Sequence, residues 1–137
     1  MGGSKQMISP GQREDFDQIL EQLIEELPEN LRTLLEEVPV IVEDEPSAED
    51  LEDMGLDPEA TDLCGLHWGI ALTRRSVENS GVLPDRISLF RAPIMRVARR
   101  QRGRREALRA QIRITLLHEI GHHFGLDEDD LAKLGYA

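Results

Sequence analysis

A long proline-free stretch near the end of the chain, from Arg105 to Phe124, limits the possible folds more than any other feature. Its apolar residues recur on one side of a helix, and they are Leu116, Leu117, Ile120 and Phe124. Gly125 follows in the position of a C-terminal cap. We therefore expect one long C-terminal helix that is anchored by its apolar side.

The rest of the chain predicts short elements that pack on this helix. Apolar residues at helical spacing predict a helix from Arg13 to Leu27, and Pro28 is placed to open a second one. Strand patterns follow at Val40–Val42, in Leu63–Leu72 before a tight turn, and at Arg86–Phe90. This order indicates an α+β fold, in which a small three- or four-stranded sheet packs on the N-terminal helices and the C-terminal helix.

The chain has 137 residues, which suffices for one modest core. We expect a single domain over residues 13–137, preceded by a flexible N-terminal segment at residues 1–12. Residues 43–62 are acidic and contain two prolines, so they predict a long exposed loop with one helical turn around Ala48 to Met54.

Cys64 is the only cysteine, so the chain can form no internal disulfide and no thiolate metal cluster. A metal site would have to use histidine and carboxylate ligands. The sequence has no apolar run long enough to cross a membrane and no secretory signal pattern. The expected location is the cytoplasm, with no membrane partner.

Charge is strongly segregated in this chain, whose net charge is -11. Residues 14–62 carry 19 acidic residues against Arg32 alone, and residues 86–113 carry 10 arginines against Glu106 alone. One interpretation is that the two segments face each other and partly neutralise in the fold. The other is that the arginines from Arg96 to Arg109 contact nucleic acid, which is disfavoured because no aromatic residues are interleaved for base stacking.

The stretch HEIGH within the long helix carries the chemistry. On a helix, residues four apart share a face, so His118 and His122 can reach one ion at about 2.0 to 2.1 Å. Glu119 is rotated by about 100° from His118, which suits a residue that holds a metal-bound water better than an equal third ligand. The pattern predicts a metal site, with zinc as the metal.

A catalytic zinc site has three protein ligands and one open position, so a third ligand is needed. Gly125 can adopt a positive φ and return the following residues to the metal. Glu128 is the first candidate, and Asp127 and Asp129 are the alternatives. The acids from Asp127 to Asp130 could also cap a last helix at Leu131–Gly135.

Other side chains are candidates for the edge of the site. His67, Trp68 and His123 are possible residues of a substrate cleft, and His67, His123 and Tyr136 are possible donors to a developing oxyanion. The simpler interpretations are a strand histidine for His67, a core or cleft-wall residue for Trp68, and a helix-surface residue or a neighbour of the ligands for His123. Cys64 is most simply a small buried hydrophobe.

The stretch EALRAQIRITLLHEIGHHFGLDEDDLAKLGYA, with LCGLHWGIALTRRS and LPDRISLFRAPI before it, resembles the small bacterial zincin-like metallopeptidases, called minimal zincins. The resemblance covers most of residues 13–137. It implies the zincin fold, an active-site helix under a small sheet, and zinc bound by His118, His122 and a downstream acid. No methionine follows Gly125, so the methionine turn of metzincins is absent.

The leading hypothesis is a zinc metallopeptidase with one zinc per chain, which hydrolyses a peptide or protein substrate by metal-activated water with Glu119 as general base. The first alternative is a non-catalytic, zinc-stabilised module that binds a protein partner. The second is a nucleic-acid-binding protein acting through Arg96 to Arg109, and nucleic acid is the less expected partner.

Overall fold

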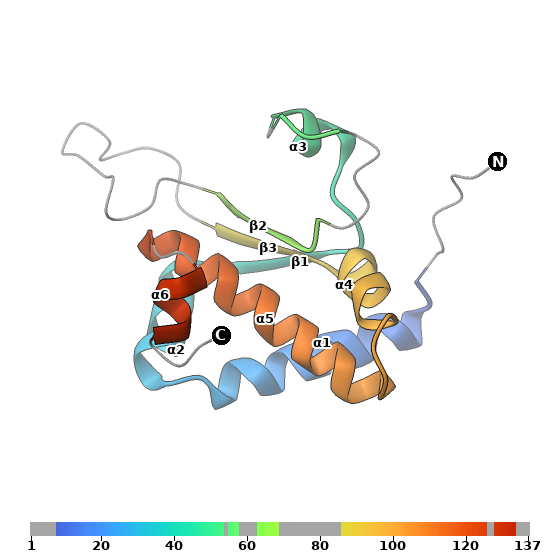
Figure 1. Ribbon diagram of the computed structural model, residues 1–137, viewed down its shortest axis with the longest axis horizontal. Coiled ribbons are helices and arrows are strands. Elements are labelled where there is room, and N and C mark those ends of the chain that lie inside the picture. Colours follow the sequence, from blue (N-terminus) through green and yellow to red (C-terminus); the bar gives the residue numbers. More distant parts are fainter. Residues whose placement is uncertain (1–7, 54, 58–62, 69–85, 126–127, 134–137) are drawn as a thin grey trace.

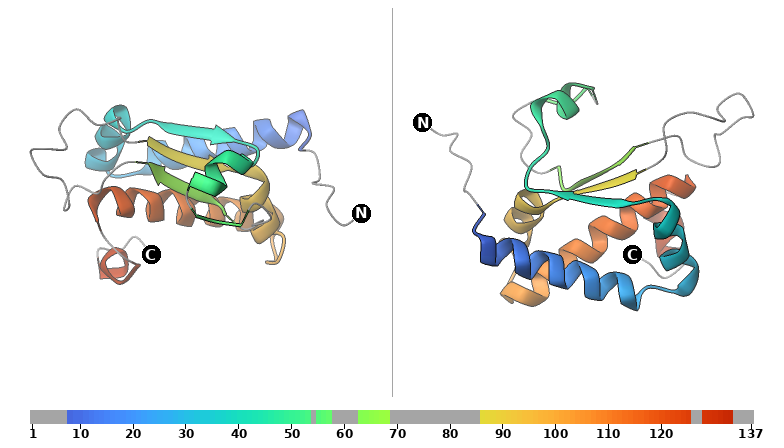
Figure 2. Two further views of the ribbon diagram at one scale, coloured as in Figure 1. Left: turned by 90° about the horizontal axis from the view of Figure 1, so that it is seen from above. Right: turned by 180° about the vertical axis from the view of Figure 1, so that it is seen from behind.

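The computed structural model describes residues 8–53, 55–57, 63–68, 86–125 and 128–133, and its fold is α+β as expected. A three-stranded sheet lies on a layer of helices formed mainly by α1 and α5, and α3 lies on the opposite side of the sheet (Figures 1 and 2). The elements are α1 (Pro10–Glu26), α2 (Glu29–Glu37), β1 (Val40–Glu43), α3 (Ala48–Asp53), β2 (Gly65–Trp68), β3 (Arg86–Phe90), α4 (Arg91–Ala98), α5 (Arg104–Phe124) and α6 (Glu128–Lys133). None of the described helices is long and apolar enough to cross a membrane.

A capping box starts helix α1. The Ser9 hydroxyl accepts a hydrogen bond from the Gln12 backbone N–H at 3.1 Å, and the Gln12 side chain accepts one from the Ser9 N–H at 2.8 Å. Pro10 fills the first helical position, where its missing N–H costs no bond. Helix α1 thus begins at Pro10, inside the segment 1–12 that was expected to be flexible. Pro28 precedes α2 as predicted.

The sheet has the strand order β1-β3-β2, so β2 forms one edge of the sheet among the described residues. Strand β3 pairs parallel with β1 and antiparallel with β2, and Leu89 of β3 lies between Val42 and Gly65. Four of the five residues of β3 are buried, as expected for a central strand covered on both faces. The strands predicted at Val40–Val42 and Arg86–Phe90 are confirmed; of the segment Leu63–Leu72, residues 65–68 form β2 and residues 69–72 lie outside the described residues.

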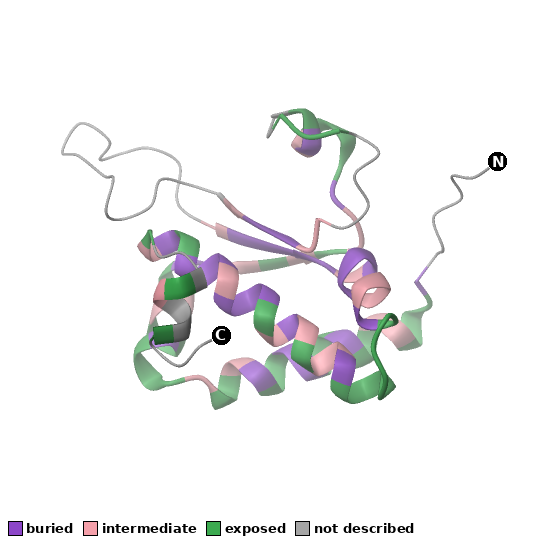
Figure 3. Cartoon of the chain, in the orientation of Figure 1, coloured by how far each residue is buried: buried purple, intermediate pink, exposed green. Residues whose placement is uncertain are grey.

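Helix α5 is the long helix predicted from the sequence and packs on β2 and β3. Gly125 ends it in the left-handed conformation, with φ at 74°, and donates its N–H to the His122 carbonyl at 3.0 Å. The buried residues gather where α5 and α1 meet the sheet (Figure 3). The core comprises Phe16, Ile19, Leu20, Leu23, Leu31, Val38, Ile87, Leu89, Ile94, Ile112, Leu116, Leu117 and Ile120.

Ion pairs join acidic residues of the N-terminal part of the chain to Arg91, Arg96 and Arg109 of its second half, and one of these acids also pairs with Arg13. Asp44 accepts hydrogen bonds from Arg13 at 2.7 Å and from Arg91 at 2.9 Å, and Arg91 also pairs with Asp17. Two pairs involve arginines of the 96–109 segment, namely Arg96 with Glu45 and Arg109 with Glu26. These contacts support the interpretation in which the two charged segments face each other.

We expect Asp44→Asn to lower the free energy of unfolding at pH 7. Hydrogen bonding to Arg13, together with Arg91, holds the pKa of Asp44 below its ordinary range, so the carboxylate form stabilises the fold above that range. Because 40% of the Arg13 side chain and 35% of the Asp44 side chain are exposed, water screens the pair, and the expected loss is about 1 kcal/mol. Urea unfolding should detect it, with Glu21→Gln on the exposed face of α1 as control; equal effects of both variants would contradict the prediction.

Helix α3 confirms the helical turn predicted around Ala48 to Met54 in the acidic 43–62 segment. Two details differ from the expectations. Leu51 of α3 is buried, so the segment is not wholly exposed. Helix α6 begins at Glu128 rather than at Leu131, so Glu128, Asp129 and Asp130 form its first turn. Acidic residues are favourable there because they face the positive end of the helix dipole.

Candidate metal centre

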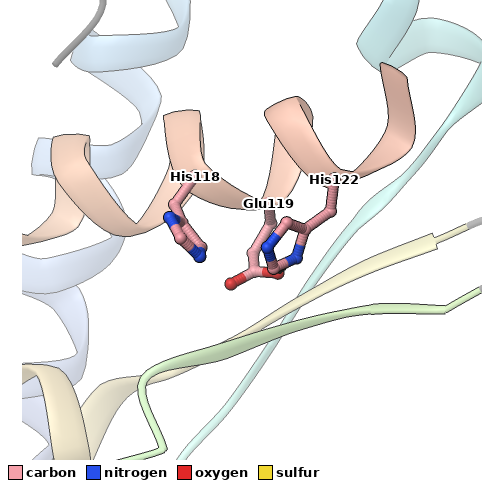
Figure 4. Close-up of side chains that lie close together, drawn as sticks. All are labelled: His118, Glu119 and His122. Atoms are coloured by element: carbon pink, nitrogen blue, oxygen red, sulfur yellow. Dashed lines mark ion pairs between the residues drawn. The ribbon is translucent and has the colours of Figure 1, made fainter. Parts of the chain in front are cut away.

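Helix α5 brings His118, Glu119 and His122 together on one side (Figure 4). One nitrogen of each histidine and one carboxylate oxygen all lie within 4.8 Å of one another. The two imidazole rings are 4.3 Å apart between centroids and inclined by 67°. The predicted convergence of two imidazoles one helical turn apart is therefore present, with a carboxylate beside it.

Glu119 is a buried acid, with only 5% of its surface exposed. Its Oε1 lies 2.9 Å from Nδ1 of His122. Burial raises the pKa of Glu119 to about 7, and the neighbouring His118 opposes this rise only in part. The carboxyl group can therefore gain or lose a proton near neutral pH, as a proton-transfer catalyst requires.

His122 stands nearer the solvent, with 46% of its side chain exposed. Partial burial still lowers its pKa below the ordinary value of 6.5, because the charged form loses hydration. At neutral pH the imidazole is therefore neutral, which is the form that binds a metal ion.

An open pocket of about 380 Å³ lies over this group, between α5 and β2. Its helical wall extends two turns beyond His118 toward the start of α5 and includes Gln111, Ile114 and Thr115. The opposite wall is the β2 region, formed by Leu63, Cys64, Gly65, Leu66 and His67. Apart from Glu119 and the histidines, the described residues that line the pocket are uncharged, and Glu119 is the acid among them.

A family comparison agrees with this geometry. Residues 35–136 match the zincin-like metallopeptidase family. The chain belongs to this family. A comparison with curated proteins finds no match.

The zincin family implies a zinc cofactor, and the residues of the centre fit it. Imidazole nitrogens are donors that zinc accepts in proteins, and the centre offers two of them with the Glu119 carboxyl group beside them. His118 and His122 present them from one rigid helix, which reduces the entropy lost on binding.

The third protein ligand stays a prediction. The positive φ of Gly125 separates α5 from α6, and α6 packs back against α5. Glu128 is the first residue of α6, while Asp127 and the side chain of Glu128 lie outside the described part of the structure. Asp129 is exposed and does not belong to the group formed by the two histidines and Glu119.

The cleft candidates differ in their positions. His67 lies on β2 and lines the pocket, with its ring 5.5 Å from that of His123. His123 is 4% exposed, so its interpretation as a helix-surface residue is wrong; β2 covers that side of α5. Tyr136 and the side chain of Trp68 lie outside the described residues. Cys64 is half-buried, packs against the core and lines the pocket.

Sequence reasoning missed the helical wall of the pocket. Ile114 lies one turn before His118, on the same face, and is 50% exposed although it is a large apolar residue. Helical spacing counted backward from His118 would have found it, because residues four apart share a face. No sequence pattern marked Gly65, since its contact with α5 joins a strand and a helix that are far apart in the sequence.

Proposed function

We propose that this chain is a zinc-dependent peptidase that hydrolyses peptide bonds in a peptide or protein substrate. The observation that carries the proposal is the convergence of His118, His122 and the buried carboxyl group of Glu119 at an open pocket. Membership of the zincin-like metallopeptidase family supports the same reaction class.

His118 and His122 would hold the zinc ion, together with one acid of the segment after Gly125. Glu128 is the preferred third ligand, with Asp127 and Asp129 as alternatives. When bound, zinc polarises the substrate carbonyl and lowers the pKa of a coordinated water.

Glu119 would act as the general base and then as the general acid. Its carboxylate accepts a proton from the attacking water, and the resulting carboxyl group donates that proton to the leaving amine. In the metal-free chain burial gives this group a pKa of about 7, and a bound cation would favour the carboxylate form that accepts the proton from water. The neighbouring β2 strand excludes water from one side of the carboxyl group.

An extended peptide substrate would lie along β2. This strand forms an edge of the described sheet and a wall of the pocket, so a peptide backbone could pair with the side of β2 that faces away from β3. His67 lies on the same strand and would donate a hydrogen bond to the substrate carbonyl as negative charge develops on its oxygen.

Zinc binding is the first test of this function. Purified protein dialysed against zinc should retain one ion per chain, and His118→Ala should lower the zinc affinity by at least about 100-fold because one of the two helical ligands is lost. His67→Ala serves as the control, since it replaces a pocket histidine that is not a proposed ligand.

Turnover is the second test. An unfolded protein substrate should be cleaved at neutral pH, and a chelator should stop the cleavage. A wild-type chain that takes up no zinc would contradict the proposal. A chain that binds zinc but cleaves nothing would instead favour the non-catalytic, zinc-stabilised binding module.

A further inference from the structure

At Gly65, β2 lies in close contact with the helix that carries the metal centre. An ideal Cβ added at Gly65 would lie 2.9 Å from the Ser88 carbonyl oxygen, 2.9 Å from Cγ2 of Thr115 and 3.2 Å from Cγ of Glu119. Side chains rarely approach a Cβ so closely, so even one methyl group requires a neighbour to move.

Two of these three neighbours are held in place. The Ser88 oxygen belongs to the backbone of the central strand β3, next to Leu89, the β-sheet partner of Gly65. The Thr115 hydroxyl donates a hydrogen bond to the Gln111 carbonyl at 2.8 Å and accepts one from the Gln111 side chain at 3.4 Å. These bonds fix the Thr115 rotamer and direct its methyl group toward Gly65.

Glu119 is the third neighbour, and its side chain is unbranched and rotatable. Its contact with Gly65 is at Cγ, two bonds before the carboxylate oxygens. A displacement at Cγ therefore moves the carboxylate group. His118 and His122 are not among the three nearest neighbours of the added Cβ, so their imidazoles are not pushed directly.

We propose that Gly65 is a positioning residue for Glu119: its bare backbone sets the place of the Glu119 carboxyl group beside the two histidines. This inference rests on the proposed function of the centre. Reacting groups must be held within a fraction of an ångström, and a misplacement of about 1 Å can lower a rate by about 100-fold.

Gly65→Ala is the test on turnover. It should lower kcat by about 10- to 100-fold with zinc affinity little changed, because neither ligand histidine is among the nearest neighbours of the added methyl group. Gly11→Ala is the matched control: its nearest contact would be the Ser9 hydroxyl at 3.9 Å, so this change is accommodated and kcat is retained. Unchanged kcat in Gly65→Ala, or loss of zinc in proportion to activity, would overturn the inference.

An equilibrium readout makes the test independent of turnover. Acetohydroxamic acid chelates zinc through two oxygens and transfers a proton to a neighbouring carboxylate. Its affinity for the zinc-loaded chain should fall by about 10-fold or more in Gly65→Ala, the size expected for loss of one hydrogen bond to a charged group. In a Glu119→Gln background, the same glycine replacement should change the affinity little.

An equal loss of acetohydroxamate affinity in both backgrounds would show that Gly65 acts through the fold rather than through Glu119. The double variant Gly65→Ala, Thr115→Ser removes the Thr115 methyl group while keeping its hydroxyl, so part of the acetohydroxamate affinity should return. If this double variant folds but its affinity does not recover, the contact between Gly65 and Thr115 does not cause the loss. A zinc-loaded chain that hydrolyses nothing but gives the expected acetohydroxamate pattern would refute the peptidase and leave the positioning role of Gly65 standing.

Discussion

Replacing Glu119 with glutamine is expected to lower peptide hydrolysis by about 100- to 10,000-fold while the chain still binds one zinc ion. Glutamine has nearly the shape of glutamate and still fills the buried site, but its amide cannot accept and return a proton. The loss should appear in kcat rather than in KM. Steady-state cleavage of a peptide substrate, with zinc content measured on the same samples, tests this prediction.

Glu106→Gln is the matched control for this experiment. Glu106 lies on the same helix as Glu119 but is exposed near its start. Its replacement removes the same charge without touching the pocket, and activity should be retained. If Glu119→Gln keeps more than about one-tenth of the activity, Glu119 is not the general base.

The same replacement should stabilise the metal-free protein at alkaline pH. The folded chain raises the pKa of Glu119 from its ordinary value of 4.5 to about 7, chiefly because burial disfavours the charged carboxylate. The contribution of Glu119 to stability is therefore fully present below pH 4.5 and is lost as the pH rises through 7. From these two pKa values, the loss amounts to about 3 kcal/mol above pH 7.

Glutamine does not titrate, so the free energies of unfolding of the two proteins should diverge with pH. Relative to wild type, metal-free Glu119→Gln should gain about 3 kcal/mol between pH 4.5 and pH 8. Urea unfolding in the presence of a chelator, at several pH values, measures this difference. A difference that stays constant across this pH range would show that the Glu119 pKa is not raised in the folded chain.

Together, these results would identify Glu119 as a residue kept for chemistry at the expense of stability. A carboxylate in a largely apolar pocket costs folding free energy, and a residue selected for packing alone would not be charged. The two histidines beside it explain why the charge is tolerated, since a bound cation would favour the ionised form.

Much of the fold could be predicted from local sequence patterns. The α5 helix follows from apolar spacing without proline, and its end follows from Gly125. The strand at Arg86–Phe90 agrees with β3 at both ends, because alternation and a nearby proline mark its limits. That His118 and His122 lie on the same face of α5 could be predicted from the helical repeat alone.

Features that depend on contacts across the chain could not be predicted in this way. The residues next to His123 in the sequence do not distinguish it from a surface residue, yet it is buried because β2 packs over it. Asp44 lies in an acidic stretch that predicts a solvated loop, but Arg13 and Arg91 converge on it from two other elements. Such pairs join residues far apart in sequence, and helical or strand periodicity carries no information about them.

The sequence alone identified His118, Glu119 and His122 as a candidate metal centre, because their spacing lies within one helix and obeys its period. Only the tertiary structure decided how that centre is enclosed. The packing of β2 on α5 at Gly65 buries Glu119 and brings its pKa to about 7. The physical reason is that the pKa of a carboxyl group depends on which atoms replace its water, and those atoms come from a strand distant in sequence.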